Sequence, residues 1–316
     1  MAWVLAVLAV YVAVILLTAW ISVHPPRTPI FLSPGFLGVP QSNTTFESVD
    51  GIELRGWWVD VPDAPTVAIL LHGYLMTRAE LAPVAVRLFQ SGCASLLIDF
   101  RAHGSSRGKT CGMGYHERQD VHAAIRHARE RYPTARIVLM GSSMGGAASA
   151  LCQAEWPEAD ALILDCAYSR LSSAITGWWR FVGGEWLTVL FAPTVLVARP
   201  LVGFRVGKVD IAQALAQTTV PVLFLHGERD TLALPVEAQR NIDACGERAT
   251  VLWLPGSNHA EGRWLHPDLY WSTVLTFLQA HAFVATTTPT LDPASSDRTP
   301  TETAVAPASA SHAPGS

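Results

Sequence analysis

The chain has 316 residues, of which 50% are hydrophobic and 15% charged, and its formal net charge is -4. This length allows one large domain or two small ones, and the slightly negative charge excludes nucleic-acid binding through a basic surface. The charged fraction is low for a soluble protein, so we expect part of the chain to lie outside water. The five cysteines are scattered without a C-x-x-C pair. They indicate small buried side chains in a reducing compartment rather than disulfides or a metal site.

Residues Ala2 to Val23 carry no charged side chain, and about 22 residues can cross a bilayer as a helix. Trp3 and Trp20 stand where interfacial aromatic residues are expected. A cleavable signal peptide is the alternative, but no Lys or Arg precedes the span and its end offers a poor cleavage site. We therefore predict an uncleaved single-pass anchor over residues 1–23. Arg27, the one nearby basic residue, and the unpaired cysteines favour a cytoplasmic globular part.

Three further regions follow the span. Residues 24–43 are rich in Pro and Gly and predict a linker along the membrane surface. Residues 44–284 predict a single α/β domain. The tail, residues 285–316, consists mainly of Thr, Pro, Ala and Ser without apolar periodicity, so it is predicted to be disordered.

Buried aliphatic strands alternate with amphipathic helices through the α/β domain. A hairpin with Asp50-Gly51 at its turn comes first, joining strands Thr44 to Val49 and Ile52 to Val61. The alternation predicts a mostly parallel sheet of about eight strands with helices on both faces. The later strands are expected at 66–71, 94–98, 137–140, 161–164, 220–225 and 249–254, and the main helices at 78–90, 117–131, 236–243 and 268–281.

Residues 169–219 depart from this alternation. They hold six large aromatic residues and few charges: Trp178, Trp179, Phe181, Trp186, Phe191 and Phe204. Three interpretations stay open for this cap-like insertion. It is a pair of helices packed on the end of the sheet, a cap that shapes an apolar acyl or ligand pocket, or a surface that touches the membrane beside the anchor.

The stretch Gly141-Ser142-Ser143-Met144-Gly145 matches G-x-S-x-G, between an apolar run and a small-residue helical pattern. A strand that turns this sharply into a helix holds the central serine at the tip of a strained elbow, with glycines where a Cβ would collide. This predicts Ser143 as a nucleophile. The N–H of Met144 at the helix start can stabilise an anion. The alternative is an ordinary strand-to-helix turn.

A base and an acid are expected in other loops at the carboxyl ends of the strands. Asp230 follows one strand and could hold an imidazole in the correct tautomer, or could instead cap a helix. His259 follows the last strand and is the predicted base. The order Ser143, Asp230, His259 matches one known hydrolase architecture. His103 and His226 also lie near strand ends and rank below His259, because neither follows the last strand.

The loop His72-Gly73-Tyr74 follows the first buried strand. Gly73 lets the backbone turn beneath the site, and the N–H of Tyr74 is the expected second oxyanion donor beside that of Met144. Losing one such donor typically costs about 10² to 10³ in rate. His72 is expected to order this loop rather than act as the base.

The stretches HGY, DFRAHGSS, GSSMGG, HGERD-TLALP and GSNHAEG occur in this order. Together they resemble the α/β-hydrolase superfamily, and within it the membrane-anchored Bem46-like and ABHD-type proteins related to the serine aminopeptidase group. The resemblance covers Val49 to His281 and implies the α/β-hydrolase fold with no cofactor or metal. Ala102 stands where this family more often has Gly, and the cap is unusually rich in Trp. The resemblance implies these roles: nucleophile Ser143, base His259, acid Asp230, and oxyanion donors Tyr74 and Met144.

The expected function is that of a serine hydrolase acting on an ester, thioester or amide through an acyl-enzyme on Ser143. Ser rather than Asp at the elbow argues against dehalogenase or epoxide-hydrolase chemistry. The expected partners are the membrane and a small-molecule or lipid-like acyl substrate, without nucleic acid. Acyl transfer with the same triad, and a non-catalytic membrane-tethered binding module, are the alternatives. The sequence leaves the oligomeric state open.

Overall fold

The computed structural model describes residues 1–285, so most of the predicted tail lies outside the described residues. Eight strands form one sheet in the order β1-β2-β4-β3-β5-β6-β7-β8. Strands β3 to β8 run parallel, while β2 is antiparallel to both β1 and β4. The strands are β1 Ser42–Glu47, β2 Glu53–Val59, β3 Thr66–Leu71, β4 Ala94–Asp99, β5 Arg136–Ser142, β6 Ala161–Asp165, β7 Val222–Gly227 and β8 Ala249–Leu254. The predicted fold class, including a mostly parallel sheet of eight strands, is confirmed.

The central strands are buried on both faces, which explains their continuous aliphatic sequences. Alternate residues of β3 enter opposite cores: Val67 and Ile69 lie on one side, and Ala68 and Leu70 on the other. The strand expected at 220–225 begins two residues later, just beyond Pro221, which has no N–H to donate to a neighbouring strand.

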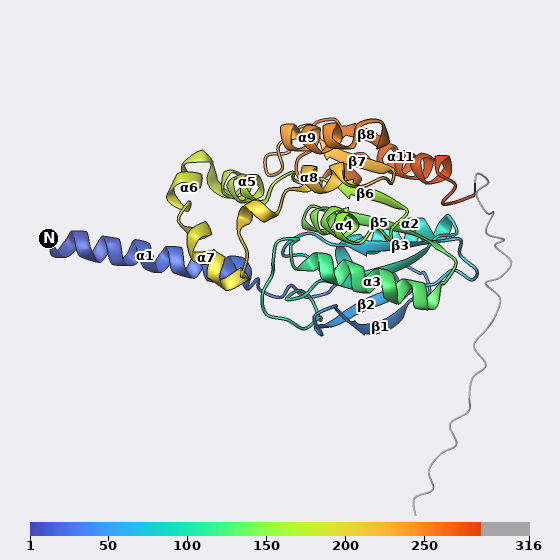
Figure 1. Cartoon of the computed structure of the whole chain (residues 1–316), viewed down its shortest axis with the longest axis horizontal. Coiled ribbons are helices and arrows are strands. Elements are labelled where there is room, and N and C mark those ends of the chain that lie inside the picture. The colour runs from blue at the N-terminus through green and yellow to red at the C-terminus, as the bar shows by residue number, and fades with distance from the viewer. Residues whose placement is uncertain (286–316) are drawn as a thin grey trace, which may run out of the picture.

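Helices cover both faces of the sheet (Figure 1). The first face carries α3, α4 and α8, and the second carries α2 and α11. Short 3-10 turns occupy 78–81, 206–208 and 246–248. The α-helices are α1 Ala2–Val23, α2 Ala82–Gln90, α3 Glu117–Arg131, α4 Met144–Glu155, α5 Leu171–Gly183, α6 Glu185–Leu190, α7 Thr194–Val202, α8 Ile211–Ala216, α9 Pro235–Cys245, α10 Gly262–Leu265 and α11 Pro267–Ala280.

Helix α1 projects from the domain, and α5 to α7 lie on the same side (Figure 1). By length and composition α1 can cross a membrane, a property that it shares with signal sequences. The cap-like insertion, residues 169–219, contains four α-helices, α5 to α8, where one of the three interpretations expected a pair. Gly184 adopts φ 106° and separates α5 from α6, and Pro193 precedes α7.

The segment after α1 is bonded to the domain. The guanidinium of Arg27 donates to four backbone carbonyls of the loop after β4, those of His103, Gly104, Ser106 and Gly108, at 2.6–3.1 Å. Thr28 Oγ1 donates to the carbonyl of Leu75 at 2.6 Å. The base of α1 is therefore held against the loops at the carboxyl end of the sheet.

Candidate active site

The turn between β5 and α4 places Ser143 in a strained conformation, with φ 49° and ψ -108°. The neighbouring glycines make this turn possible. A Cβ on Gly141 would lie 2.3 Å from the backbone of Gly145, and one on Gly145 would lie 2.1 Å from the carbonyl oxygen of Leu71. The N–H of Ser143 donates to the carbonyl of Asp165 at 2.7 Å, which ties the turn to β6.

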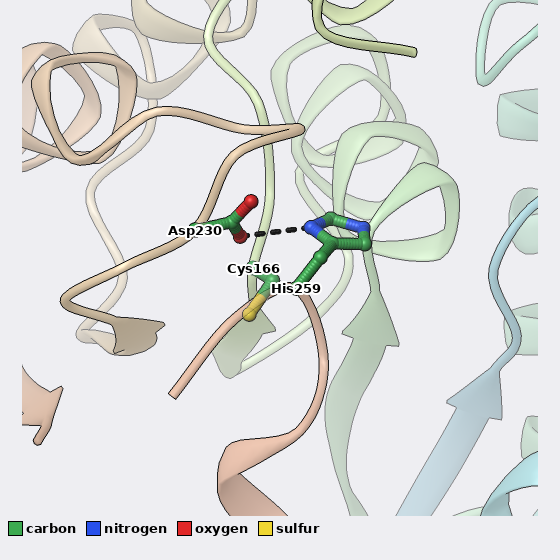
Figure 2. Close-up of side chains that lie close together, drawn as sticks. All are labelled: Cys166, Asp230 and His259. Atoms are coloured by element: carbon green, nitrogen blue, oxygen red, sulfur yellow. Dashed lines mark hydrogen bonds and ion pairs between the residues drawn. The ribbon is translucent and has the colours of Figure 1, made fainter. Parts of the chain in front are cut away.

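Ser143, His259 and Asp230 form one chain of hydrogen bonds. Ser143 Oγ lies 3.0 Å from His259 Nε2, and His259 Nδ1 lies 2.8 Å from Asp230 Oδ2. Figure 2 shows the carboxylate, from the loop after β7, pointing at the imidazole, from the loop after β8. The consistent tautomer has Nδ1–H donating to Asp230 and Nε2 accepting from the serine hydroxyl. This arrangement allows His259 to take the serine proton.

Backbone groups fix the carboxylate of Asp230. Its Oδ1 accepts from the N–H groups of Leu232 and Ala233 at 2.9 and 2.8 Å, and its side chain is completely buried. Helix α9 begins at Pro235 after an N-cap at Leu234. Asp230 therefore stabilises the turn before this helix rather than capping the helix itself, and its second oxygen remains for His259.

The two competing histidines have other partners. The Nε2 of His226 lies 2.8 Å from the carbonyl of Ala233 and 3.7 Å from Asp230. The Nδ1 of His103 lies 2.9 Å from the carbonyl of Arg101. Burial lowers the pKa of both rings, that of His103 to about 4. In the part of the chain that the structure describes, the histidine bonded to Ser143 is His259.

The two expected oxyanion donors border the nucleophile. Met144 is the first residue of α4, where N–H groups have no intrahelical acceptor. A Cβ on Gly73 would lie 3.7 Å from the Cβ of Ser143, so the loop that carries Tyr74 adjoins the serine. His72 braces this loop: its Nδ1 lies 2.7 Å from the Gly73 carbonyl, and its Nε2 accepts from the N–H of Phe100 at 3.0 Å.

A buried ion pair that sequence reasoning missed supports the same loop and the elbow. Glu80 Oε2 accepts from the N–H of Gly73 at 2.8 Å, and Oε1 accepts from Ser142 Oγ at 2.8 Å and from Arg263 Nη2 at 2.6 Å. Burial raises the pKa of Glu80, but the charge of Arg263 and these hydrogen bonds outweigh burial and leave the pKa below its usual value. Asp165 lies 3.7 Å from Arg263 Nε and accepts from Tyr270 Oη. No local motif marks either member of the pair.

A cavity of about 310 Å³ opens beside Ser143 and His259. Its walls are mostly apolar and come from the cap, the loop after β3 and the last turn of α1. They include Ser22, Val23, Tyr74, Trp178, Val195 and Val202. Such a space suits an apolar ligand whose reacting group lies at the serine.

Cys166, Asp230 and His259 offer three possible metal ligands within 4.8 Å of one another (Figure 2). Two of these atoms, Asp230 Oδ2 and His259 Nδ1, already bond each other. Burial raises the pKa of the Cys166 thiol well above its usual value, which disfavours the thiolate that a metal requires. The donor set therefore fits a hydrogen-bonded serine site better than a metal centre.

The model of the serine aminopeptidase family, S33, matches residues 62–208. The α/β hydrolase domain-containing protein WAV2 of Arabidopsis thaliana is 26% identical over 269 residues, covering 79% of this chain and 82% of its own length. The monoacylglycerol lipase of Mycolicibacterium smegmatis is 27% identical over 232 residues, covering 63% of this chain and 82% of the lipase.

Among solved structures, an esterase of Pyrococcus furiosus is similar with a TM-score of 0.70 and 27% identity, covering 82% of this chain and 98% of the esterase. These relatives support a hydrolytic function. The strand order, the elbow at Ser143 and the matches to known proteins agree: the chain has the α/β-hydrolase fold, and its similarities support the α/β-hydrolase superfamily.

Proposed function

We propose that this protein is a serine hydrolase that cleaves an ester, thioester or amide through an acyl-enzyme on Ser143. The observation that carries the proposal is the hydrogen-bond chain from Ser143 through His259 to Asp230. Its geometry meets the requirement that a base lie within about 2.6–3.2 Å of the proton donor. The strained backbone of Ser143 holds the hydroxyl in this position before substrate binds.

In the proposed reaction, Ser143 Oγ attacks the acyl carbonyl carbon while His259 Nε2 takes the hydroxyl proton. The N–H groups of Tyr74 and Met144 stabilise the oxyanion. The imidazolium then gives its proton to the leaving alcohol, thiol or amine as the bond to the carbonyl carbon breaks. Water, deprotonated by His259, attacks the acyl-enzyme. The imidazolium returns the proton to Ser143 Oγ as the bond to the acyl carbon breaks, which releases the carboxylic acid. Asp230 stabilises the imidazolium in both steps.

The apolar cavity supports an acyl group with a hydrocarbon chain as the substrate. One relative is an esterase by name, and another is a monoacylglycerol lipase. We therefore propose carboxylic esters of small or lipid-like molecules as the first substrates to test.

A fluorophosphonate probe tests the nucleophile. Wild type should be labelled, Ser143→Ala should not, and the exposed-helix control Ser272→Ala should be labelled as wild type. Peptide mapping should place the adduct on Ser143. Labelling of Ser143→Ala, or a folded wild type that takes no label and turns over no ester, would refute the assignment. Product analysis with added alcohols or amines separates hydrolysis from acyl transfer.

We also propose that α1 is retained as an anchor, with residues 44–284 as the catalytic domain and 169–219 as its cap. The contacts of Ser22 and Val23 support retention, because Tyr74 Oη donates to the Ser22 carbonyl at 2.9 Å and the N–H of Cys111 donates to that of Val23 at 2.8 Å. Cleavage near residue 24 would remove both acceptors. Intact-mass analysis of membrane-extracted protein should find residues 1–23 present, and a mature chain beginning near His24 would contradict the proposal.

A further inference from the structure

The half of α1 nearer the domain has a side that faces the protein. Ile15, Ala19 and Val23 are buried, and Tyr11 is half-buried, at the spacing of one helix face. Tyr11 Oη donates to the carbonyl of Leu190 at 2.7 Å, which ties the middle of α1 to the end of α6. Helices α1 and α7 pack against each other. The cap therefore touches α1 along its length from Tyr11 to Val23, not only at its base (Figure 1).

This contact determines how deep the cap would lie in a membrane. The helix rises about 1.5 Å per residue, so the stretch from Tyr11 to Val23 is about 18 Å long. The hydrocarbon core of a bilayer is about 30 Å thick. When α1 crosses the bilayer, α6 and α7 lie beside it within one leaflet.

The outer side of the cap has the composition that a leaflet requires. Several of its large apolar side chains are exposed: Phe181, Val182, Trp186, Val189, Leu190, Leu196 and Leu201. Helices α5 to α7 carry three charged residues, of which Arg180 and Glu185 form an ion pair with each other. Arg199 is the third, and a long Arg side chain can extend toward the headgroups. The apolar surface continues onto the exposed side of α1, so bilayer lipid is the occupant that fits it.

The cavity connects this apolar region with the nucleophile. Ser22 and Val23 from the last turn of α1 line it together with Trp178 of α5 and Val195 of α7, and Ser143 lines the same space. The wall of the cavity is thus partly made by the anchor helix itself.

We propose that α5 to α7 enter one leaflet beside α1, and that the last turn of α1 forms a wall of the acyl site. The substrate is then a membrane-resident amphiphile with a single acyl chain, which passes from the bilayer to Ser143 without crossing water. This proposal rests on the proposed function, because it assigns an acyl substrate to Ser143. For an ester that is dissolved in water instead of the bilayer, each methylene that the cavity buries should raise kcat/KM about fourfold until the cavity is full.

Cap depth is tested in liposomes with Val189→Cys carrying an environment-sensitive fluorophore. The native cysteines are all buried, so labelling is selective for the introduced thiol. Quenching by lipids with a doxyl group in mid-chain, and not by aqueous iodide, is the expected result. The control Glu130→Cys, on an exposed part of α3, should be quenched by iodide alone. Quenching of the Val189 site by iodide would place the cap in water, and protection from both quenchers would indicate a second protein copy. Either outcome overturns the proposal.

The role of α1 in the site is tested with p-nitrophenyl esters of increasing chain length. Val23→Trp narrows the cavity, so the ratio of kcat/KM for palmitate to that for butyrate should fall more than tenfold. Leu16→Trp places the same side chain on the exposed side of α1 and should change this ratio less than twofold. Val23→Ala should shift the preferred length toward longer chains, and it serves as the second variant if Val23→Trp does not fold.

The outcomes separate the two proposals. Ester turnover that depends on Ser143 but keeps the wild-type chain-length ratio in both Val23 variants would overturn the role of α1 alone. Turnover that persists in Ser143→Ala, or is absent from folded wild type, would overturn the proposed function.

Discussion

Glu80→Gln should slow catalysis and destabilise the fold, although Glu80 is not a member of the proposed triad. The carboxylate accepts three hydrogen bonds, from Gly73, Ser142 and Arg263, on two oxygens. The amide of Gln has one accepting oxygen, and its NH₂ group cannot accept from the N–H of Gly73 or from Arg263. The substitution therefore leaves at least one donor without an acceptor and removes the counter-charge of Arg263.

The magnitude follows from burial. The side chains of Glu80 and Arg263 are 8% and 5% exposed, and breaking a buried pair costs about 3–5 kcal/mol. Asp165, 3.7 Å from Arg263, remains as a partial counter-ion, so we expect the lower end, about 3 kcal/mol. The Gly73 N–H also loses its fixed acceptor, which frees the loop of Tyr74. Loss of one oxyanion donor lowers the catalytic rate about 10²- to 10³-fold, so kcat should fall about 10²-fold with little change in KM.

The assay combines thermal or chemical unfolding in detergent with turnover of p-nitrophenyl butyrate. Glu130→Gln on α3 is the matched control, because its side chain is 73% exposed, and it should stay within about 0.5 kcal/mol of wild type. A double-mutant cycle with Arg263→Met should give a coupling of more than about 1 kcal/mol. An unfolding free energy and kcat for Glu80→Gln that both match the control would refute the reasoning.

Three further predictions concern the elbow, the acid and pH. Gly145→Ala should fail to fold or lose all turnover, because its Cβ would meet the Leu71 carbonyl oxygen at 2.1 Å, and circular dichroism with the ester assay would detect either. Asp230→Asn should lower kcat about 10³- to 10⁴-fold, because the amide no longer fixes the tautomer of His259. Probe labelling of Ser143 should slow in parallel, and an unchanged kcat would count against the triad. Burial lowers the pKa of His72 to about 4, while the pKa of a histidine in the unfolded chain is about 6.5. The unfolded state therefore binds the proton first as pH falls, and stability that is complete above pH 6.5 should drop by about 3 kcal/mol by pH 4. Equal melting temperatures at pH 7.5 and 5 would contradict this account.

The sequence allowed the sheet to be predicted because its strands are buried on both faces. Runs such as Thr66 to Leu71 contain few polar residues, and their ends coincide with turn residues. The cap was harder to predict. Two of its helices bury little of their surface in the domain, as α6 has no buried residue and α7 has only Thr194. Without a buried stripe, periodicity does not distinguish a packed helix pair from a membrane-facing surface.

The residues of the proposed triad were predictable because each one lies in a loop directly after a strand. A parallel sheet brings such loops together whatever their separation along the chain. The pair of Glu80 and Arg263 lacks this signal. The two residues are 183 positions apart, and their charges are indistinguishable in sequence from those of exposed helices. Their partnership depends on how α10 packs over β7, which no local pattern records.

Tyr74 connects the two parts of the molecule that the sequence treats as separate, the anchor and the catalytic domain. Its backbone N–H is the proposed oxyanion donor, and its phenol donates to the Ser22 carbonyl at the end of α1. Burial raises the pKa of this phenol well above its usual value, so the hydroxyl keeps the proton that it donates. A displacement of α1 would therefore act on the loop of Tyr74 as well as on the cavity wall. Because rate depends steeply on the placement of an oxyanion donor, the proposed activity should depend on α1 even for substrates too short to reach Val23.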